Sequence, residues 1–312
     1  MSASADPLAQ LPRRVEIVEV GPRDGLQNER DVLDVDTRVA FIERLIAAGF
    51  RRIEVGAFVS PKWVPQMAHA DAVLKRLGRR EGVRFSVLVP NLRGLEMAID
   101  AGAEEVAVFA AASETFSHRN INCSIAESLE RYRAVTERAR TAGIRVRGYV
   151  SCIAGCPYEG EMPVRRVVDV AAALDRMGCC EISLGDTIGV ATPRRIVELL
   201  GACAQAVPLA RIALHLHDTY GQALANVLAG LLFGVRTFDA AAAGLGGCPY
   251  APGASGNLAS EDLLYMLDGL GIESGVDLDR LVDATAFIME RLGRPPRSKV
   301  AFARLVACAP TG

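Results

Sequence analysis

Two histidines, His215 and His217, are the residues whose types and spacing point most directly to chemistry. They follow the apolar run 212–214, and in a β-strand residues two apart point to the same face. A single histidine near a strand end is more often a satisfied core residue, but two neutral imidazoles a few ångströms apart suit a divalent metal ion. The pair therefore predicts a metal site and, since a metal polarises an oxygen ligand, an enzyme.

Other side chains could complete such a site. Asp24 offers a carboxylate and Asn257 an amide oxygen. Mixed nitrogen and oxygen ligands without a thiolate favour Mg²⁺ or Mn²⁺ over structural zinc. Arg23 stands next to Asp24, either as half of a surface ion pair or as a fixed positive charge near a developing oxyanion. The residue types alone leave both roles of Arg23 open.

Three further residues are candidates for acid–base chemistry. Glu54 and Asp186 are each either a structural partner of Arg23 or a base. Cys248 lies in the glycine- and proline-rich loop 244–256, which is a plain turn, a phosphate cradle or a lid that closes on substrate. A thiol with a pKa near 8.5 is mostly protonated at neutral pH, so it can donate a proton to a carbanion. A metal site beside this thiol suits the cleavage of a carbon–carbon bond.

Strand-like and helix-like runs alternate along the chain and would position these residues. We expect strands at 15–20, 52–55, 84–89, 105–109, 145–150, 180–184, 211–216 and 237–241. We expect helices at 37–48, 64–77, 92–101, 125–142, 164–177, 193–206 and 222–233. This alternation predicts an α/β fold, a (β/α)₈ TIM barrel, with extra C-terminal helices at 260–270 and 279–292.

A doubly wound open sheet is the alternative architecture. It is disfavoured because no G-x-G-x-x-G motif follows the first strand. In a TIM barrel the catalytic residues lie at the C-terminal ends of the strands, and the polar residues named above fall at such ends. The fold prediction and the site prediction therefore support each other.

The composition is that of a globular protein, and we expect one domain over residues 1–312 with 1–14 as a disordered lead-in. The net charge is −2 with no basic block, so nucleic acid is not an expected partner. No run approaches the ~18 apolar residues that span a bilayer, and no secretory signal is recognisable, so we expect no membrane association. The cysteines lack C-x-x-C spacing, which favours reduced thiols and a cytoplasmic location.

Several long motifs carry a family resemblance. They are VGPRDGLQNE at 20–29, FVSPKWVPQM at 58–67, NINCS at 120–124, RGYVSC at 147–152, GCPYEG at 155–160, SLGDTIG at 183–189, HLHDTYGQALAN at 215–226 and GLGGCPY at 244–250. On these motifs the chain resembles the 3-hydroxy-3-methylglutaryl-CoA lyases, a family of metal-dependent barrel lyases, from about residue 15 to residue 303. The resemblance implies cleavage of 3-hydroxy-3-methylglutaryl-CoA into acetyl-CoA and acetoacetate.

The resemblance also implies roles for residues of this sequence. It places a divalent metal, Mg²⁺ or Mn²⁺, on Asp24, His215, His217 and Asn257. Arg23 would stabilise the enolate oxygen of the departing acetyl-CoA, and Cys248 would protonate the carbanion. Asp24 and His215 are candidates for removing the proton of the C3 hydroxyl, while Glu54 and Asp186 would support the site and orient Arg23. The expected contacts with the acyl-CoA substrate are Arg23, Gln27, Arg30, Asn120, Ser124 and Thr187, and a homodimer is expected.

Two departures from the family bear on the substrate. The family commonly carries a serine just before the position of Phe58, where this sequence has Gly56 and Ala57. Many relatives carry asparagine and lysine in the stretch where this sequence has Gly293, Arg294 and Pro295 at the end of the last helix. A related 3-hydroxy-3-alkylglutaryl-CoA, such as the isohexenyl analogue, is therefore an alternative substrate. Less favoured alternatives are a Claisen-type acyl-CoA condensing enzyme and a metal-binding scaffold without activity.

Overall fold

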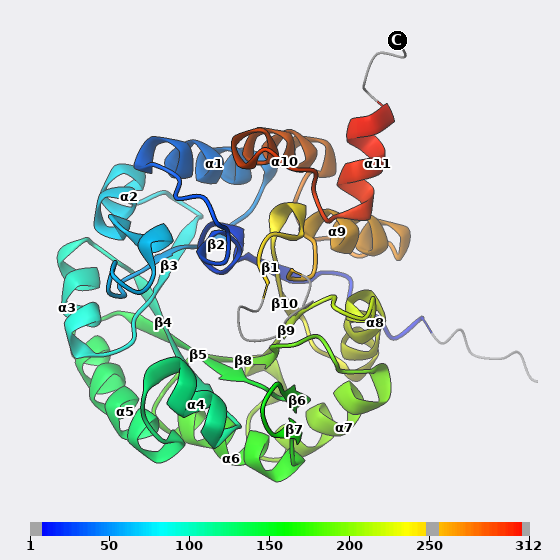
Figure 1. The fold of residues 1–312 in the computed structure, drawn as a ribbon. Helices are drawn as coiled ribbons and strands as arrows, with labels where there is room; N and C mark the ends of the chain where they lie inside the picture. Colours follow the sequence, from blue (N-terminus) through cyan, green and yellow to red (C-terminus); the bar gives the residue numbers. More distant parts are fainter. Residues whose placement is uncertain (1–7, 248–255, 308–312) are drawn as a thin grey trace, which may run out of the picture.

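A computed structural model describes residues 8–247 and 256–307, which form a closed barrel surrounded by helices (Figure 1). The barrel strands are parallel and neighbour one another in the order β1-β10-β9-β8-β5-β4-β3-β2. Their bounds are β1 Glu16–Glu19, β2 Arg52–Ala57, β3 Arg84–Leu88, β4 Glu105–Ala111, β5 Arg145–Ser151, β8 Glu181–Asp186, β9 Ile212–Leu216 and β10 Thr237–Ala240. The predicted (β/α)₈ barrel is confirmed, with strand ends displaced by one or two residues in most cases.

Helices surround the strands in Figure 1, most of them in one outer ring. They are α1 Val35–Ala48, α2 Ala70–Leu77, α3 Leu92–Asp100, α4 Glu114–Ile121, α5 Ile125–Thr141, α6 Val164–Arg176, α7 Pro193–Cys203, α8 Ala223–Phe233, α9 Ser260–Gly269, α10 Leu278–Leu292 and α11 Lys299–Ala307. Helix α10 packs against α1 and so joins the end of the chain to its beginning. In the described part of the chain, no helix has the length and apolar character needed to cross a membrane.

The structure adds elements that the sequence did not predict. A π-helical turn, η1 Gly21–Gly25, follows β1, and helix α4 lies between β4 and α5. A short antiparallel hairpin, β6 Gly155–Cys156 with β7 Gly160–Glu161, follows β5. Helix α11 is a third C-terminal helix where two were expected. Three of these additions, namely η1, α4 and the hairpin, follow the C-terminal ends of barrel strands, where loops carry function in this architecture.

The predicted helix 64–77 is broken in two. A single 3₁₀ turn, η2 Pro65–Met67, precedes α2, and His69 between them has left-handed backbone dihedrals with φ of 59°. The buried Arg38 on α1 donates from Nη1 to the carbonyl oxygen of Ala68 at 2.8 Å. That carbonyl is therefore engaged by a side chain at the point where a continuous helix would need it for its own ladder.

Arg38 also reaches the second strand. Its Nη2 donates to the carbonyl oxygen of Val55 at 3.4 Å, where the pairing of β2 with β3 shifts register between Glu54 and Gly56. Among the described residues no acidic side chain is an electrostatic partner of this guanidinium, and burial lowers the pKa of Arg38 to about 10. Both Nη atoms donate to backbone carbonyls, while the buried Nε has no hydrogen-bond partner among the described residues, so the two Nη contacts connect the irregular part of β2 to α1.

Charged side chains occupy the interior of the barrel. Arg147 on β5 is fully buried and donates from Nε to Glu181 Oε1 at 2.6 Å. Its two Nη atoms donate to the carboxylate of Asp239 on β10 at 3.0 and 2.7 Å. Arg52 donates to both oxygens of Glu181 at 3.1 and 2.8 Å. Unpaired buried charges are strongly destabilising, so this set of pairs holds the strands in one relative position.

Glu19 at the end of β1 connects three segments at the face of the barrel where the strands have their C-terminal ends, which is called the catalytic face below. Its Oε1 accepts the N–H groups of Gly21 and Ala242 at 2.8 and 2.9 Å, and its Oε2 accepts the hydroxyl of Ser260 at 2.6 Å. The side chain has no exposed surface, and this burial raises the pKa of Glu19 to about 8. Glu19 therefore joins η1 to the turn η4 Ala242–Gly244 and to the start of α9.

The raised pKa of Glu19 gives a test on stability. In the folded protein the carboxyl prefers its neutral form, so its contribution is fully present below the usual pKa of 4.5 and is lost as the pH rises to about 8. The Glu19→Gln variant stays neutral, keeps an acceptor oxygen for Gly21 and Ala242, and offers Ser260 an N–H donor, so the Ser260 hydroxyl becomes the acceptor. As the pH rises between these values, the wild type should lose stability and the variant should not. We therefore expect the free energy of unfolding of the variant minus that of the wild type, measured in urea, to increase by about 2–4 kcal/mol. If the free energies of unfolding of the two proteins change with pH in the same way over this range, the raised pKa of Glu19 is contradicted.

Candidate active site

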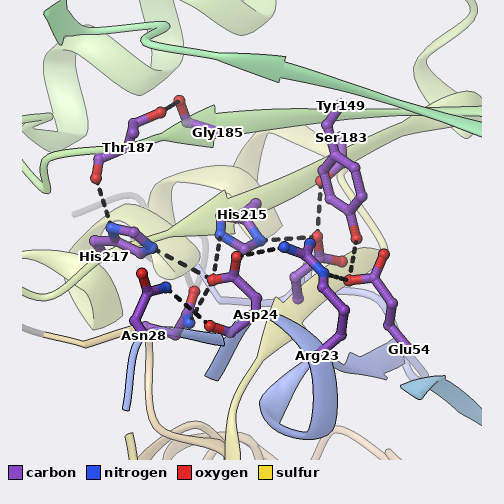
Figure 2. A network of polar contacts seen from close by, with 12 residues as sticks. Arg23, Asp24, Asn28, Glu54, Tyr149, Ser183, Gly185, Thr187, His215 and His217 are labelled. Atoms are coloured by element: carbon purple, nitrogen blue, oxygen red, sulfur yellow. Dashed lines mark hydrogen bonds and ion pairs between the residues drawn. The ribbon is translucent and has the colours of Figure 1, made fainter. Parts of the chain in front are cut away.

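The two predicted imidazoles lie side by side at the end of β9 (Figure 2). His215 belongs to the strand, and His217 follows it and pairs with Asn257 in an isolated antiparallel bridge. The ring centroids are 5.3 Å apart, and both side chains are buried. The spacing of two residues therefore presents both rings to one space, as the sequence predicted.

Hydrogen bonds at Nδ1 decide which nitrogen of each ring is free. His217 Nδ1 lies 2.6 Å from the carbonyl oxygen of Thr187, and a carbonyl can only accept. His215 Nδ1 lies 3.1 Å from Oδ2 of Asp239. Although burial opposes it, Arg147 holds the pKa of Asp239 well below its usual range, so this carboxylate also only accepts. In its neutral form each ring thus carries its proton on Nδ1 and turns a lone pair on Nε2 toward the site.

Asp24 faces these two Nε2 atoms. Its Oδ2 lies 3.8 Å from Nε2 of His215 and 4.0 Å from Nε2 of His217. Burial opposes ionisation of Asp24, but the neighbouring Arg23 lowers the pKa of this carboxyl to about 2. Burial lowers the pKa of His217 to about 4. At neutral pH the site thus combines a carboxylate with a neutral imidazole, as a metal requires.

The unpartnered atoms at this point fit a metal ion. His217 Nε2 and Asn257 Oδ1 are buried and have no hydrogen-bond partner among the described residues. Asn257 uses its Nδ2 instead, donating to Asp24 Oδ2 at 2.8 Å and to the carbonyl oxygen of Leu245 at 3.1 Å. One ligand atom each from Asp24, His215 and His217 lie within 4.8 Å of one another. Nitrogen and oxygen donors without thiolate suit a hard or borderline divalent cation.

Arg23 lies beside the cluster of candidate metal ligands, namely Asp24, His215, His217 and Asn257 (Figure 2). Carboxylates hydrogen-bond its guanidinium on two sides. Its Nε donates to Glu54 Oε2 at 2.6 Å and its Nη1 donates to Asp24 Oδ1 at 2.7 Å. Tyr149 places its ring 5.8 Å from the guanidinium carbon and its hydroxyl 3.4 Å from Glu54 Oε2. Arg23 and Asp24 both belong to η1, whose wide turn brings consecutive side chains into the same site. The guanidinium is therefore a fixed positive charge.

The contacts of Asp186 differ from the expectation that it would orient Arg23 together with Glu54. Its two oxygens accept the N–H groups of Val190 at 3.1 Å and Ala191 at 2.8 Å. Burial raises the pKa of Asp186 to about 6. Asp186 thus shapes the turn after β8, because a carboxylate just past a strand readily binds the following backbone N–H groups. The same turn carries Thr187, whose carbonyl orients His217.

The residues expected to contact the acyl-CoA lie on loops and helix ends of the catalytic face. Gln27 is half-buried just after η1, and Arg30 is exposed further along that loop. Asn120 is exposed on α4. Ser124 is the N-cap of α5, where its hydroxyl exchanges hydrogen bonds with Glu127. Contact of these residues with substrate stays a prediction, and Cys248 lies outside the described residues.

Four residues of the site were missed by the sequence analysis: Arg147, Tyr149, Ser183 and Asp239. They lie on three different strands, and their contacts join residues up to 95 positions apart. The sequence holds one signal for them, since polar residues recur at every second position in otherwise apolar strands, as at 147 and 149 or 181 and 183. That period of two marks one face of each strand as polar, here the barrel interior.

Comparison with known proteins adds independent findings. The HMGL-like family model matches residues 14–288. The human mitochondrial hydroxymethylglutaryl-CoA lyase is 54% identical over 300 residues, which cover 96% of this chain and 92% of that protein. The 3-hydroxy-3-isohexenylglutaryl-CoA/hydroxy-methylglutaryl-CoA lyase of Pseudomonas aeruginosa is 56% identical over 295 residues, covering 95% and 98%.

Solved structures agree with these relatives. The crystal structure of a hydroxymethylglutaryl-CoA lyase from Pseudomonas aeruginosa superposes with a TM-score of 0.93 at 55% identity, covering 96% of this chain and 99% of that one. An HMG-CoA lyase from Acinetobacter baumannii, in complex with coenzyme A and 3-methylmalate, gives a TM-score of 0.89 at 34% identity, covering 96% and 97%.

The unpartnered Nε2 of His217 gives a direct test of the metal site. In the His217→Ala variant we expect the affinity for Mn²⁺, measured by calorimetry on metal-stripped protein, to fall by about 100-fold or more. Loss of an outer hydrogen-bond partner already costs 10- to 100-fold in known sites, and a lost ligand should cost at least as much. His118→Ala, which removes an exposed imidazole on α4, is the matched control. Equal affinities in the two variants would exclude His217 as a ligand.

Proposed function

Since this chain belongs to the HMGL-like family of hydroxymethylglutaryl-CoA lyases, we propose that it cleaves 3-hydroxy-3-methylglutaryl-CoA into acetyl-CoA and acetoacetate. The observation that carries the proposal at the level of residues is one constellation. Asp24, His215 and His217 bring ligand atoms together, and Arg23 stands fixed beside them. Cleavage needs both parts, because an alkoxide must form at one carbon while an enolate leaves from its neighbour.

The ligand set would hold a divalent cation, Mg²⁺ or Mn²⁺, through Asp24, His215, His217 and Asn257. When bound, such an ion polarises the carboxylate and C3 hydroxyl oxygens of the substrate and makes the hydroxyl more acidic. The protein supplies the remaining chemistry. Support for the ligand set comes from the two buried atoms without partners, His217 Nε2 and Asn257 Oδ1.

The bond changes balance as a retro-Claisen cleavage. A base takes the proton of the C3 hydroxyl, the C3–O bond becomes a carbonyl, and the C2–C3 bond breaks. Its electron pair moves onto the thioester fragment as an enolate, and C3 leaves as the ketone carbon of acetoacetate. Asp24 and His215 are the two candidate bases, since each presents an oxygen or nitrogen lone pair at the cluster.

Arg23 is the residue proposed to receive the negative charge of the enolate. Its bonds to Glu54 and Asp24 use two of its five N–H groups and lock the guanidinium plane, so the rest point in fixed directions. A preorganised donor of this kind contributes about 2.7–4 kcal/mol to the stability of a transition state. Glu54 and Tyr149 act on the reaction through Arg23, because both contact it from the barrel interior.

Cys248 is proposed as the acid that completes the reaction. Its thiol would give a proton to C2 of the enolate and so release acetyl-CoA. The residues on either side of its loop are held at the site, since Asn257 donates to the carbonyl oxygen of Leu245. Arg297 also donates to the carbonyl oxygen of Gly246. The ends of the loop therefore lie next to Asp24, which supports this role.

A larger 3-alkyl substrate is the second candidate. The Pseudomonas aeruginosa relative is named for both the isohexenyl and the methyl substrate, and it is 56% identical to this chain. The residue that supports the candidate here is Ala57, which is buried at the end of β2 and follows the register shift beside Glu54. Membership of the lyase family favours cleavage over the condensing reaction. A homodimer and a cytoplasmic location remain predictions from the sequence.

The first experiment is product analysis. Metal-stripped protein receives Mg²⁺ or Mn²⁺ and 3-hydroxy-3-methylglutaryl-CoA, and acetyl-CoA and acetoacetate are quantified. We expect both in equal amounts only when metal is present. In the Cys248→Ala variant we expect turnover to fall by about 100-fold or more, since general acid catalysis contributes 10²–10⁴-fold. No products from folded protein that binds metal would reject the methyl substrate, and full turnover in the variant would reject Cys248 as the acid.

The acyl preference is tested at Ala57. A serine there adds a hydroxyl to a buried position close to Glu54, so we expect Ala57→Ser to lower kcat/KM for the isohexenyl substrate more than for the methyl substrate, by about 10-fold. Ala139→Ser on α5 is the matched control, because Ala139 is equally buried but packs on the outer ring. A ratio of kcat/KM values that is identical in all three proteins would show that Ala57 does not select the acyl group.

A further inference from the structure

The two imidazoles of the cluster are held in different ways. His217 donates its Nδ1–H to the backbone carbonyl of Thr187, a partner that cannot change its charge. His215 instead faces the carboxylate of Asp239, which belongs to β10. Asp239 is not among the proposed ligands, and no role has been given to it in the reaction. The use of a buried carboxylate at this one position requires a physical reason.

Asp239 is saturated with donors. Its Oδ1 accepts from Arg147 Nη2 at 2.7 Å. Its Oδ2 accepts from Arg147 Nη1 at 3.0 Å and from the hydroxyl of Ser183 at 2.9 Å, in addition to facing His215. The side chain is 1% exposed, so water does not compete for these bonds. Every neighbour of the carboxylate is a donor, and His215 can join this set only through an Nδ1–H group.

Arg147 in turn is rigidly placed. Its Nε donates to Glu181 and its Nη1 also donates to the hydroxyl of Tyr149 at 2.8 Å. The participants come from β5, β8, β9 and β10, so the geometry at Asp239 is fixed by the barrel itself. A rotated imidazole, or one protonated on Nε2, would lose the bond to Asp239 and would point a proton at Asp24.

We infer that Asp239 is a positioning residue that fixes the ring orientation and the Nδ1–H tautomer of His215 and so keeps Nε2 free for the metal. The inference rests on the proposed metal site but concerns a group outside it. Histidine ligands in metal sites commonly donate their second N–H to a carboxylate, which sets the tautomer and the orientation of the ring. Here the carboxylate of Asp239 is itself held in place by hydrogen bonds from Arg147 in the centre of the barrel.

The competing explanation is that Asp239 serves only to neutralise Arg147 inside the barrel. Both explanations predict a loss of stability when Asp239 is removed, so stability does not separate them. The tautomer of His215 does, because a purely structural ion pair has no effect on which nitrogen of the ring carries the proton. This property can be measured without metal and without substrate.

The test uses full-length, metal-free protein labelled with ¹⁵N on histidine. The chain has four histidines, of which His69 and His118 are exposed and provide solvent references. At alkaline pH, where the imidazole is neutral, we expect the wild-type His215 ring to show a protonated Nδ1 and an unprotonated Nε2. In Asp239→Asn the amide oxygen stays with Arg147 and the amide NH₂ turns toward the ring, so we expect the proton to move to Nε2. The His217→Ala variant assigns the signals.

The matched control is Ser183→Ala, which removes one donor to the same Oδ2 atom but leaves the carboxylate in place. We expect its His215 tautomer to be that of the wild type. Affinity for Mn²⁺ provides the second readout, and we expect Asp239→Asn to bind about 10- to 100-fold more weakly than the wild type and Ser183→Ala to bind nearly normally.

The outcomes separate the inference from the proposed function. A neutral wild-type His215 that carries its proton on Nε2 instead of Nδ1, or a folded Asp239→Asn variant with an unchanged tautomer, overturns the role of Asp239. Because the wild-type spectrum alone can reject the role, it remains testable if Asp239→Asn does not fold. A wild-type protein that shows the expected tautomer but binds no Mn²⁺ overturns the metal site and leaves the role of Asp239 supported.

Discussion

The pairing of Arg147 with Glu181 and Asp239 is the constraint on which the rest of the site depends. An arginine in the centre of a barrel has no access to water, so it is tolerated only with its charge and its N–H groups fully matched. Matching it takes carboxylates from two other strands, and those carboxylates then serve further partners, namely Arg52 at one end and His215 at the other. A row of alternating charges thus runs through the interior to the catalytic face.

This interior differs from that of a barrel filled with branched aliphatic side chains. Layers of aliphatic side chains only fill the volume of the interior, whereas hydrogen-bonded charged side chains also fix the orientation of the residues that they contact. The positions of Arg23 and His215 show the effect. Arg23 is oriented through Glu54 and Tyr149, and His215 through Asp239, so both halves of the proposed reaction take their geometry from Arg147 or from residues in contact with it. The loops of the catalytic face contribute side chains, and the barrel interior sets their angles.

The sequence predicted those parts of the site that local patterns encode. His215 and His217 could be identified because a strand period of two places them together, and Asp24 and Asn257 because they follow strand ends in recognisable motifs. The break at 64–77 could not be predicted, since it depends on Arg38 reaching the carbonyl of Ala68 across thirty positions. The backbone contacts of Asp186 could not be predicted, because proximity to a strand end does not reveal whether a carboxylate binds a side chain or its own backbone. Long-range pairs such as Arg147 and Asp239 have no local signature beyond polarity at alternate positions.

Arg38 and Gly56 show how this architecture restricts change in the sequence. A Cβ atom at position 56 would lie 3.2 Å from Nη2 of Arg38 and 3.1 Å from Cβ of Ala70, so a side chain there presses on the guanidinium. The arginine can retreat only by giving up the carbonyl of Val55 and thereby loosening β2 beside Glu54. A larger residue at position 56 is therefore best accommodated when position 38 carries a shorter positively charged side chain than arginine. The two positions, on α1 and β2, should therefore covary among homologues.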